Sequence, residues 1–112
     1  METIFHITKR EEWERAKRDG IYQTPSLASE GFIHCSLNEQ VIRTANRLFS
    51  GQTGLVLLEI DPRQVSAEIR YENCEGGQEV FPHIYGALDL GAVVRVAAFE
   101  PGEDGSFAMP SV

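Results

Sequence analysis

Residues 31–39, with the sequence Gly-Phe-Ile-His-Cys-Ser-Leu-Asn-Glu, indicate most clearly how this chain folds. The first five residues are typical of a strand, and the last four form a capping box, in which a Ser N-cap is followed three residues later by Glu. The pattern His-x-Ser/Thr-x-x-Glu also occurs at residues 6–11, after the strand-like segment 3–7. The two copies predict two strands that each end in a His two residues before a helix, with Thr8 and Ser36 as the N-caps.

All three histidines of the chain, His6, His34 and His83, fall in such strand-end positions. A helix N-terminus exposes unpaired N–H groups and favours anions. An imidazole titrates near pH 6.5 and can bond ribose or phosphate oxygens or transfer a proton. Tyr85 is expected on the same side of its strand as His83, where it can stack on a flat ring. We therefore predict a site for a phosphorylated or dinucleotide ligand; the alternative is that each His is a core-edge imidazole bonded to the backbone.

Hydrophobic periodicity predicts the secondary structure. A first helix is expected over residues 9–19, anchored by Trp13 and stopped by Gly20. A second helix follows from apolar residues at helical spacing, which are Leu37, Val41, Ala45, Leu48 and Phe49. Strands are expected at residues 54–61, 67–71, 81–86 and 92–99, the last of them buried. The order predicts one α+β domain over residues 1–112, with two helices and a split, mostly antiparallel sheet of about six strands.

Composition excludes several classes of function. The chain has 112 residues and a formal net charge of −7, which disfavours nucleic acid and anionic membranes as partners. It has no apolar run long enough to span a membrane, and its N-terminal residues lack the features of a signal peptide. Its two cysteines, Cys35 and Cys74, form no C-x-x-C motif. We expect a cytoplasmic, monomeric protein that binds a small anionic metabolite.

Two other kinds of site are weaker alternatives. Two His-x-Ser/Thr motifs are typical of two-histidine phosphoesterases, but here the motifs are close together and the capping boxes already explain the hydroxyls. A three-histidine metal site with Glu72, Glu75 or Glu79 as a fourth ligand has no support from ligand spacing. Arg70 and Arg95 could clamp a pyrophosphate, although ion pairs with acidic neighbours are the expected use.

Four segments together resemble a bacterial protein family, the domain of unknown function 952. They are residues 5–8 (Phe-His-Ile-Thr), 30–36 (Glu-Gly-Phe-Ile-His-Cys-Ser) with Gln40 and Asn46, 57–61 (Leu-Leu-Glu-Ile-Asp) and 81–86 (Phe-Pro-His-Ile-Tyr-Gly). The fold of this family is similar to that of ADP-ribosyltransferases, in which a split α+β sheet binds NAD in a cleft. The resemblance therefore implies an ADP-ribosyltransferase-like domain.

The resemblance also implies roles for individual residues. His6 matches the histidine that holds the ribose of NAD, and His34 with Ser36 falls on the second strand of the cleft. The late motif around His83 contains no Glu, so Glu72 or Glu79 would have to supply the carboxylate that stabilises an oxocarbenium-like transition state.

This assignment gives a possible ADP-ribosyltransferase or NAD glycohydrolase. Its catalytic residues would be His34, His83 and Glu72, and its ligand-binding residues His6, Thr8, Ser36 and Tyr85. No tightly bound cofactor or metal is expected, and NAD would be a substrate. The alternative is a binding module for a small anionic metabolite that performs no chemistry.

Overall fold

The computed structural model describes residues 2–73 and 79–110 of the chain. The helices are α1 (Arg10–Asp19), α2 (Pro25–Glu30) and α3 (Val41–Leu48), and the 3-10 turns are η1 (Asn38–Gln40), η2 (Pro62–Gln64) and η3 (Leu90–Ala92). The strands are β1 (Ile4–Lys9), β2 (Ile21–Tyr22), β3 (Ile33–His34), β4 (Ser36–Leu37), β5 (Leu55–Ile60), β6 (Glu68–Glu72), β7 (Phe81–Tyr85), β8 (Leu88–Asp89) and β9 (Val93–Phe99). The α+β class is confirmed, but the described residues hold nine strands and a third α-helix, where about six strands and two helices were expected.

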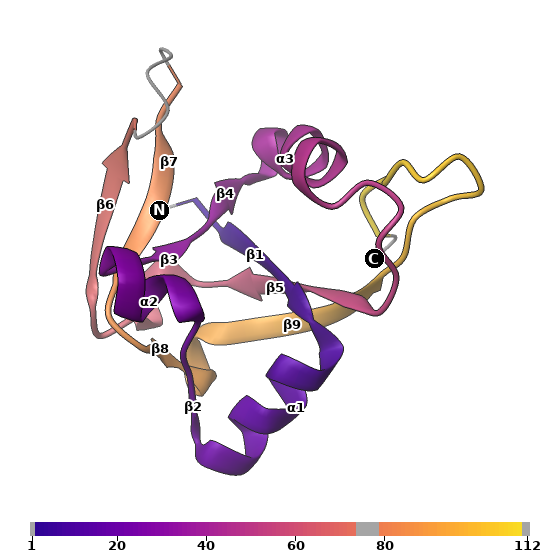
Figure 1. Ribbon diagram of the computed structural model, residues 1–112. Coiled ribbons are helices and arrows are strands. Elements are labelled where there is room, and N and C mark those ends of the chain that lie inside the picture. Colours follow the sequence, from indigo (N-terminus) through magenta and orange to yellow (C-terminus); the bar gives the residue numbers. More distant parts are fainter. Residues whose placement is uncertain (1, 74–78, 111–112) are drawn as a thin grey trace.

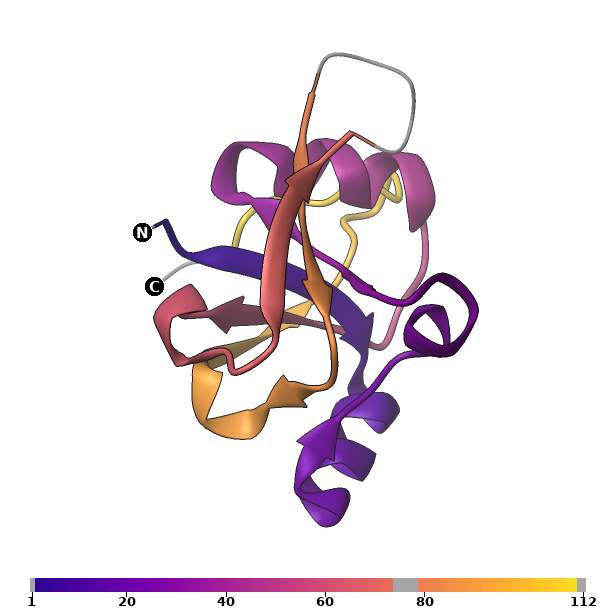
Figure 2. The ribbon, with the colours of Figure 1, turned by 90° about the vertical axis from the view of Figure 1, so that its left-hand side faces the viewer.

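The strands form three antiparallel sheets, with the orders β4-β1-β5-β9, β3-β7-β6 and β2-β8. In the four-stranded sheet β5 lies between β1 and β9. Leu55 and Leu57 pack with α3 on one face, and Val56 and Leu58 pack with α1 on the other. Figures 1 and 2 show the two helices on opposite sides of this sheet. Burial on both faces explains why β5 reads as a continuous apolar run rather than an alternating one.

The three-stranded sheet packs one of its faces against the main core. Ile33 pairs with Ile84, which pairs in turn with Ile69, and these side chains belong to the main core. Side chains alternate between the two faces of a strand, so the neighbouring residues point away from the core. His34 and His83 are direct partners on this second face.

The expected N-cap role of Thr8 is wrong. Strand β1 continues through Thr8, because its pairing with β5 runs as far as Lys9 and Leu55. Lys9 is the N-cap of α1 and makes no side-chain cap hydrogen bond. The Thr8 hydroxyl lies 2.8 Å from that of Tyr22 instead.

The expected N-cap role of Ser36 is also wrong. Ser36 lies in β4 and pairs with Phe5, so the chain stays extended there. The helical segment starts at η1, where the Leu37 N–H donates to the Gln40 side chain over 2.8 Å. Neither His therefore sits two residues before a helix; the register of the sheets overrides the local capping pattern.

Other expectations hold with small changes. Helix α1 ends at Gly20 in the left-handed conformation (φ 82°), and it buries Trp13 and Ala16. Strand β9 is not fully buried, because it is an outer strand, and Val94 is 58% exposed. None of the helices in the described ranges is long and apolar enough to cross a membrane.

Candidate functional site

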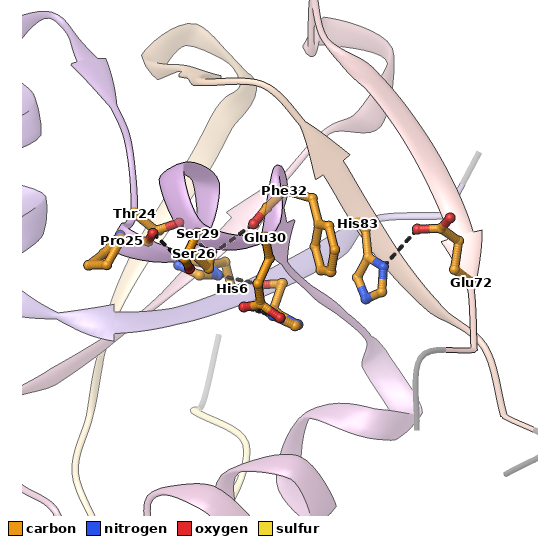
Figure 3. A network of polar contacts seen from close by, with 10 residues as sticks. His6, Thr24, Pro25, Ser26, Ser29, Glu30, Phe32, Glu72 and His83 are labelled. Carbon is orange, nitrogen blue, oxygen red and sulfur yellow. Dashed lines mark hydrogen bonds and ion pairs between the residues drawn. The ribbon is translucent and has the colours of Figure 1, made fainter. Parts of the chain in front are cut away.

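The second face of the three-stranded sheet carries two imidazoles side by side. The ring centroids of His34 and His83 are 5.3 Å apart, and the ring planes are inclined by 77°. Phe32 holds both rings: it stacks on His83 with 4.1 Å between centroids and 19° between planes, and its centroid lies 4.8 Å from that of His34. Figure 3 shows the His83 ring between Phe32 and Glu72. The aromatic contacts restrict the orientation of both imidazoles.

Each of the two imidazoles also contacts a carboxylate. His83 Nδ1 lies 3.0 Å from Glu72 Oε1, and the Tyr85 hydroxyl donates to the same oxygen over 2.5 Å. These bonds, first that of Tyr85 and then that of His83, lower the pKa of Glu72, which therefore stays ionised at neutral pH. His34 Nε2 lies 3.1 Å from Glu30 Oε2, four residues earlier in the chain. The site thus contains two carboxylate–imidazole pairs.

A cavity of about 480 Å³ opens beside the two imidazoles. It forms because β1 and β4 pair only at two positions, Ile4 with Leu37 and Phe5 with Ser36, and the chain before Ser36 belongs to another sheet. The residues that line the cavity are Phe5, His6, Ile7, Ser26, Glu30, His34, Cys35, Ser36, Thr44, Arg47, Leu48, Phe49, Phe81 and His83. Its size is within the range of small-molecule sites, which is about 300–1,000 Å³.

Helix α3 supplies one wall of the cavity. Thr44, Arg47 and Leu48 are three and four residues apart, so they share a helix face. The adjoining face of the helix packs into the core through Val41 and Ala45. The wall therefore offers a hydroxyl, a guanidinium group and an apolar side chain to a ligand.

His6 is a structural histidine in this arrangement. It is buried, and both ring nitrogens are in use: Nδ1 lies 2.5 Å from the His34 carbonyl oxygen and Nε2 lies 2.8 Å from the Tyr22 hydroxyl. Burial, the largest effect, lowers the pKa of His6 to about 4, so the ring is neutral at neutral pH. A carbonyl can only accept, so Nδ1 carries the proton. Burial also raises the pKa of Tyr22, which keeps that hydroxyl protonated.

The structure brings together only some of the predicted site residues. His34, His83 and Ser36 line the cavity, as does His6, although both of its nitrogens are engaged. Glu72 and Tyr85 are not among the described lining residues; Glu72 contacts His83, and the Tyr85 hydroxyl donates to Glu72.

Thr8 is likewise not among the described lining residues; it lies near Tyr22. Tyr85 was predicted to stack on a flat ring of a ligand. In the structure the Arg70 guanidinium lies over the Tyr85 ring, 4.4 Å from its centroid.

Sequence reasoning missed Glu30, Phe32 and Arg47 as site residues. Glu30 precedes His34 by four positions, but the intervening Gly31 breaks the helix, so spacing alone gave no signal. Phe32 shares a strand face with His34, which was visible from alternation. Arg47 lies on the exposed side of an amphipathic helix, where a solvated charge is the usual interpretation.

The weaker alternatives gain no support. The described residues contain no group of three or more His, Cys, Asp or Glu that could hold a metal ion, and the candidate ligand Glu75 lies outside the described residues. Arg70 forms an ion pair with Glu68, as expected for an exposed arginine. With both nitrogens of His6 engaged, the two His-x-Ser/Thr motifs do not face one phosphate.

Two solved structures of one protein are similar to this chain. The crystal structure of protein CC0527 from Caulobacter crescentus is 34% identical to this chain, with a TM-score of 0.85, and the alignment covers 95% of this chain and 93% of that one. The solution structure of the same protein is 36% identical, with a TM-score of 0.83 and coverage of 95% and 91%. The names of these structures state no ligand or activity. No functionally curated protein matches.

A family model described as "Protein of unknown function (DUF952)" matches residues 7–96. That range contains the described residues that line the cavity, apart from Phe5 and His6. The chain therefore belongs to the DUF952 family.

Proposed function

We propose that the cavity binds a small anionic metabolite that carries a flat ring, with NAD or a related nucleotide as the first candidate. The observation that carries this proposal is the mixed lining of the cavity, which combines ring-sized apolar side chains with hydrogen-bond donors. Aromatic and aliphatic side chains, Phe5, Phe49, Phe81, Ile7 and Leu48, offer surfaces for a ring. Polar groups, His34, His83, Ser36, Thr44 and Arg47, offer donors for ribose and phosphate oxygens.

Cleavage of the N-glycosidic bond has less support than binding. Such a step needs a carboxylate beside the ribose, and Glu72 is the candidate from the ADP-ribosyltransferase resemblance. Its Oε1 already accepts from Tyr85 and His83. Glu72 would have to leave both partners to enter the cavity. We therefore propose binding without transfer of ADP-ribose, and expect no nicotinamide release from NAD.

A thermal-shift and calorimetric titration with NAD, ADP-ribose and AMP tests binding. A ligand at 100 times its dissociation constant should add about 2.7 kcal/mol to the free energy of unfolding. His34→Ala and Arg47→Gln should weaken the stabilisation. Arg63→Gln is the matched control, because Arg63 pairs with Asp61 away from the cavity. If no nucleotide stabilises the wild-type protein at millimolar concentration, the proposal is wrong.

A further inference from the structure

The two imidazoles contact carboxylates through different ring nitrogens. His83 Nδ1 contacts Glu72 and His34 Nε2 contacts Glu30. A carboxylate beside one nitrogen of an imidazole fixes the proton there, so proton exchange with a ligand uses the other nitrogen. The nitrogens for such exchange are therefore Nε2 of His83 and Nδ1 of His34, on two rings 5.3 Å apart.

The surroundings of the two rings suit opposite tasks. The His83 side chain is 3% exposed, stacks on Phe32 and has an ionised carboxylate behind it. A sheltered imidazole oriented by a carboxylate is the arrangement of a general base. The His34 side chain is 52% exposed, so water can restore its proton after each turnover. Two titratable groups in unlike environments can divide the roles of base and acid between them.

The charge of the cavity indicates the class of substrate. Among the described lining residues, Arg47 carries one positive charge and Glu30 one negative charge. A guanidinium group with the hydroxyls of Ser36 and Thr44 suits the oxygens of a phosphate. The chain as a whole has a formal net charge of −7, which opposes a dianion more than a monoanion. A phosphodiester, with one charge on its phosphorus centre, fits this balance better than a phosphomonoester.

We propose that the cavity hydrolyses a phosphodiester, with His83 as general base and His34 as general acid. The proposal rests on the proposed binding of a phosphate-bearing ligand at the same site and adds a reaction to it. As the oxygen of a water molecule bonds to phosphorus, His83 Nε2 takes a proton from that water. The P–O bond to the leaving group breaks, and His34 gives its proton to the departing oxygen. The products are an alcohol and a phosphomonoester, and solvent returns both rings to their starting states.

Glu72 is a positioning residue in this reaction, because it touches His83 and not the substrate. Its effect should be visible in a split between kcat and KM. Glu72→Gln keeps the size of the side chain but removes the carboxylate that orients His83, so kcat should fall while KM changes little. A merely structural role for Glu72 would distort the cavity and raise KM as well.

The test uses two diesters that differ in their leaving group. Bis(p-nitrophenyl) phosphate releases a stable phenolate that needs no proton, whereas 2′,3′-cyclic AMP releases an alkoxide that does. His83→Gln should lower kcat at least 100-fold for both substrates. His34→Gln should lower kcat at least 100-fold for 2′,3′-cyclic AMP and much less for the nitrophenyl ester. Arg63→Gln should change neither rate, and the melting temperature of each variant checks its folding.

Several results would overturn the inference. They are no turnover of either diester by the wild-type protein, full activity in a folded His83→Gln variant, and equal losses for both substrates in His34→Gln. Stabilisation by NAD or ADP-ribose without diester turnover would overturn the reaction and leave the binding proposal intact. Turnover of bis(p-nitrophenyl) phosphate alone, with no nucleotide turned over or stabilising the protein, would support the reaction and overturn the nucleotide as ligand.

Discussion

The buried His6 should make the fold sensitive to mild acid. In the folded protein its pKa is lowered to about 4, whereas an imidazole in the unfolded chain takes up a proton near pH 6.5. Between these values the unfolded state binds more protons, so the free energy of unfolding falls as the pH is lowered. The contribution of the neutral ring is complete above pH 6.5 and is lost as the pH approaches 4. The shift corresponds to about 3 kcal/mol in total, of which about 2 kcal/mol is lost between pH 7 and pH 5.

The variant His6→Asn isolates this effect. Its amide N–H can still donate to the His34 carbonyl, but the side chain does not titrate. It should be less stable than the wild type at pH 7, because the Tyr22 hydroxyl loses its hydrogen bond to the ring and keeps the one to Thr8. Between pH 7 and pH 5, its free energy of unfolding should fall by about 2 kcal/mol less than that of the wild type. His34 and His83 are present in both proteins, so their titration largely cancels in the difference.

Urea unfolding at several pH values measures the difference directly. Trp13 is the only tryptophan and is buried, so its fluorescence reports global unfolding. The range between pH 7 and pH 5 also avoids most of the titration of carboxylates. Equal losses of stability in the wild type and in His6→Asn would refute the assignment of His6 as a neutral, structural imidazole.

Three further predictions concern stability and can be checked by urea unfolding. Gly86→Ala should destabilise the fold by about 1–3 kcal/mol, because the new Cβ would lie 2.8 Å from that of Ala67; Gly91→Ala, with open space around it, should not. Phe107→Ala should cost about 3 kcal/mol through loss of a buried aromatic side chain, and a change below 1 kcal/mol would show that residues after β9 do not support the core. Gln40→Ala should cost about 1–3 kcal/mol, because its buried side chain bonds two backbone groups, and Gln40→Glu should restore only the bond that the side-chain oxygen accepts.

The fold was predictable where a hydrophobic pattern and a stop signal agree. The helix that ends at Gly20 and the central strand around residues 55–58 were both found near their expected positions. The two capping boxes misled, because Thr8 and Ser36 belong to strands whose partners lie far away in the sequence. A single sequence does not contain the pairing of distant strands, and here that pairing decides the local structure.

The sequence identified the histidines of the candidate site, but it did not distinguish the buried, structural histidine from the exposed one. Alternation along residues 81–86 correctly placed His83 and Tyr85 on one side of a strand. Nothing local distinguishes His6, which is locked inside the fold, from His34, which faces solvent. Both follow a strand-like segment and precede a hydroxyl residue by two positions. Their difference depends on Tyr22, which comes from another sheet.

The four-stranded sheet has a consequence for the speed and cooperativity of folding. Its long strands come from residues 4–9, 55–60 and 93–99, so neighbouring strands are separated by tens of residues along the chain. Each pairing must close a long loop before its contacts form, which slows folding relative to a helical bundle of similar size. The amide protons of β5, bonded on both sides, should exchange with deuterium only when the whole molecule opens.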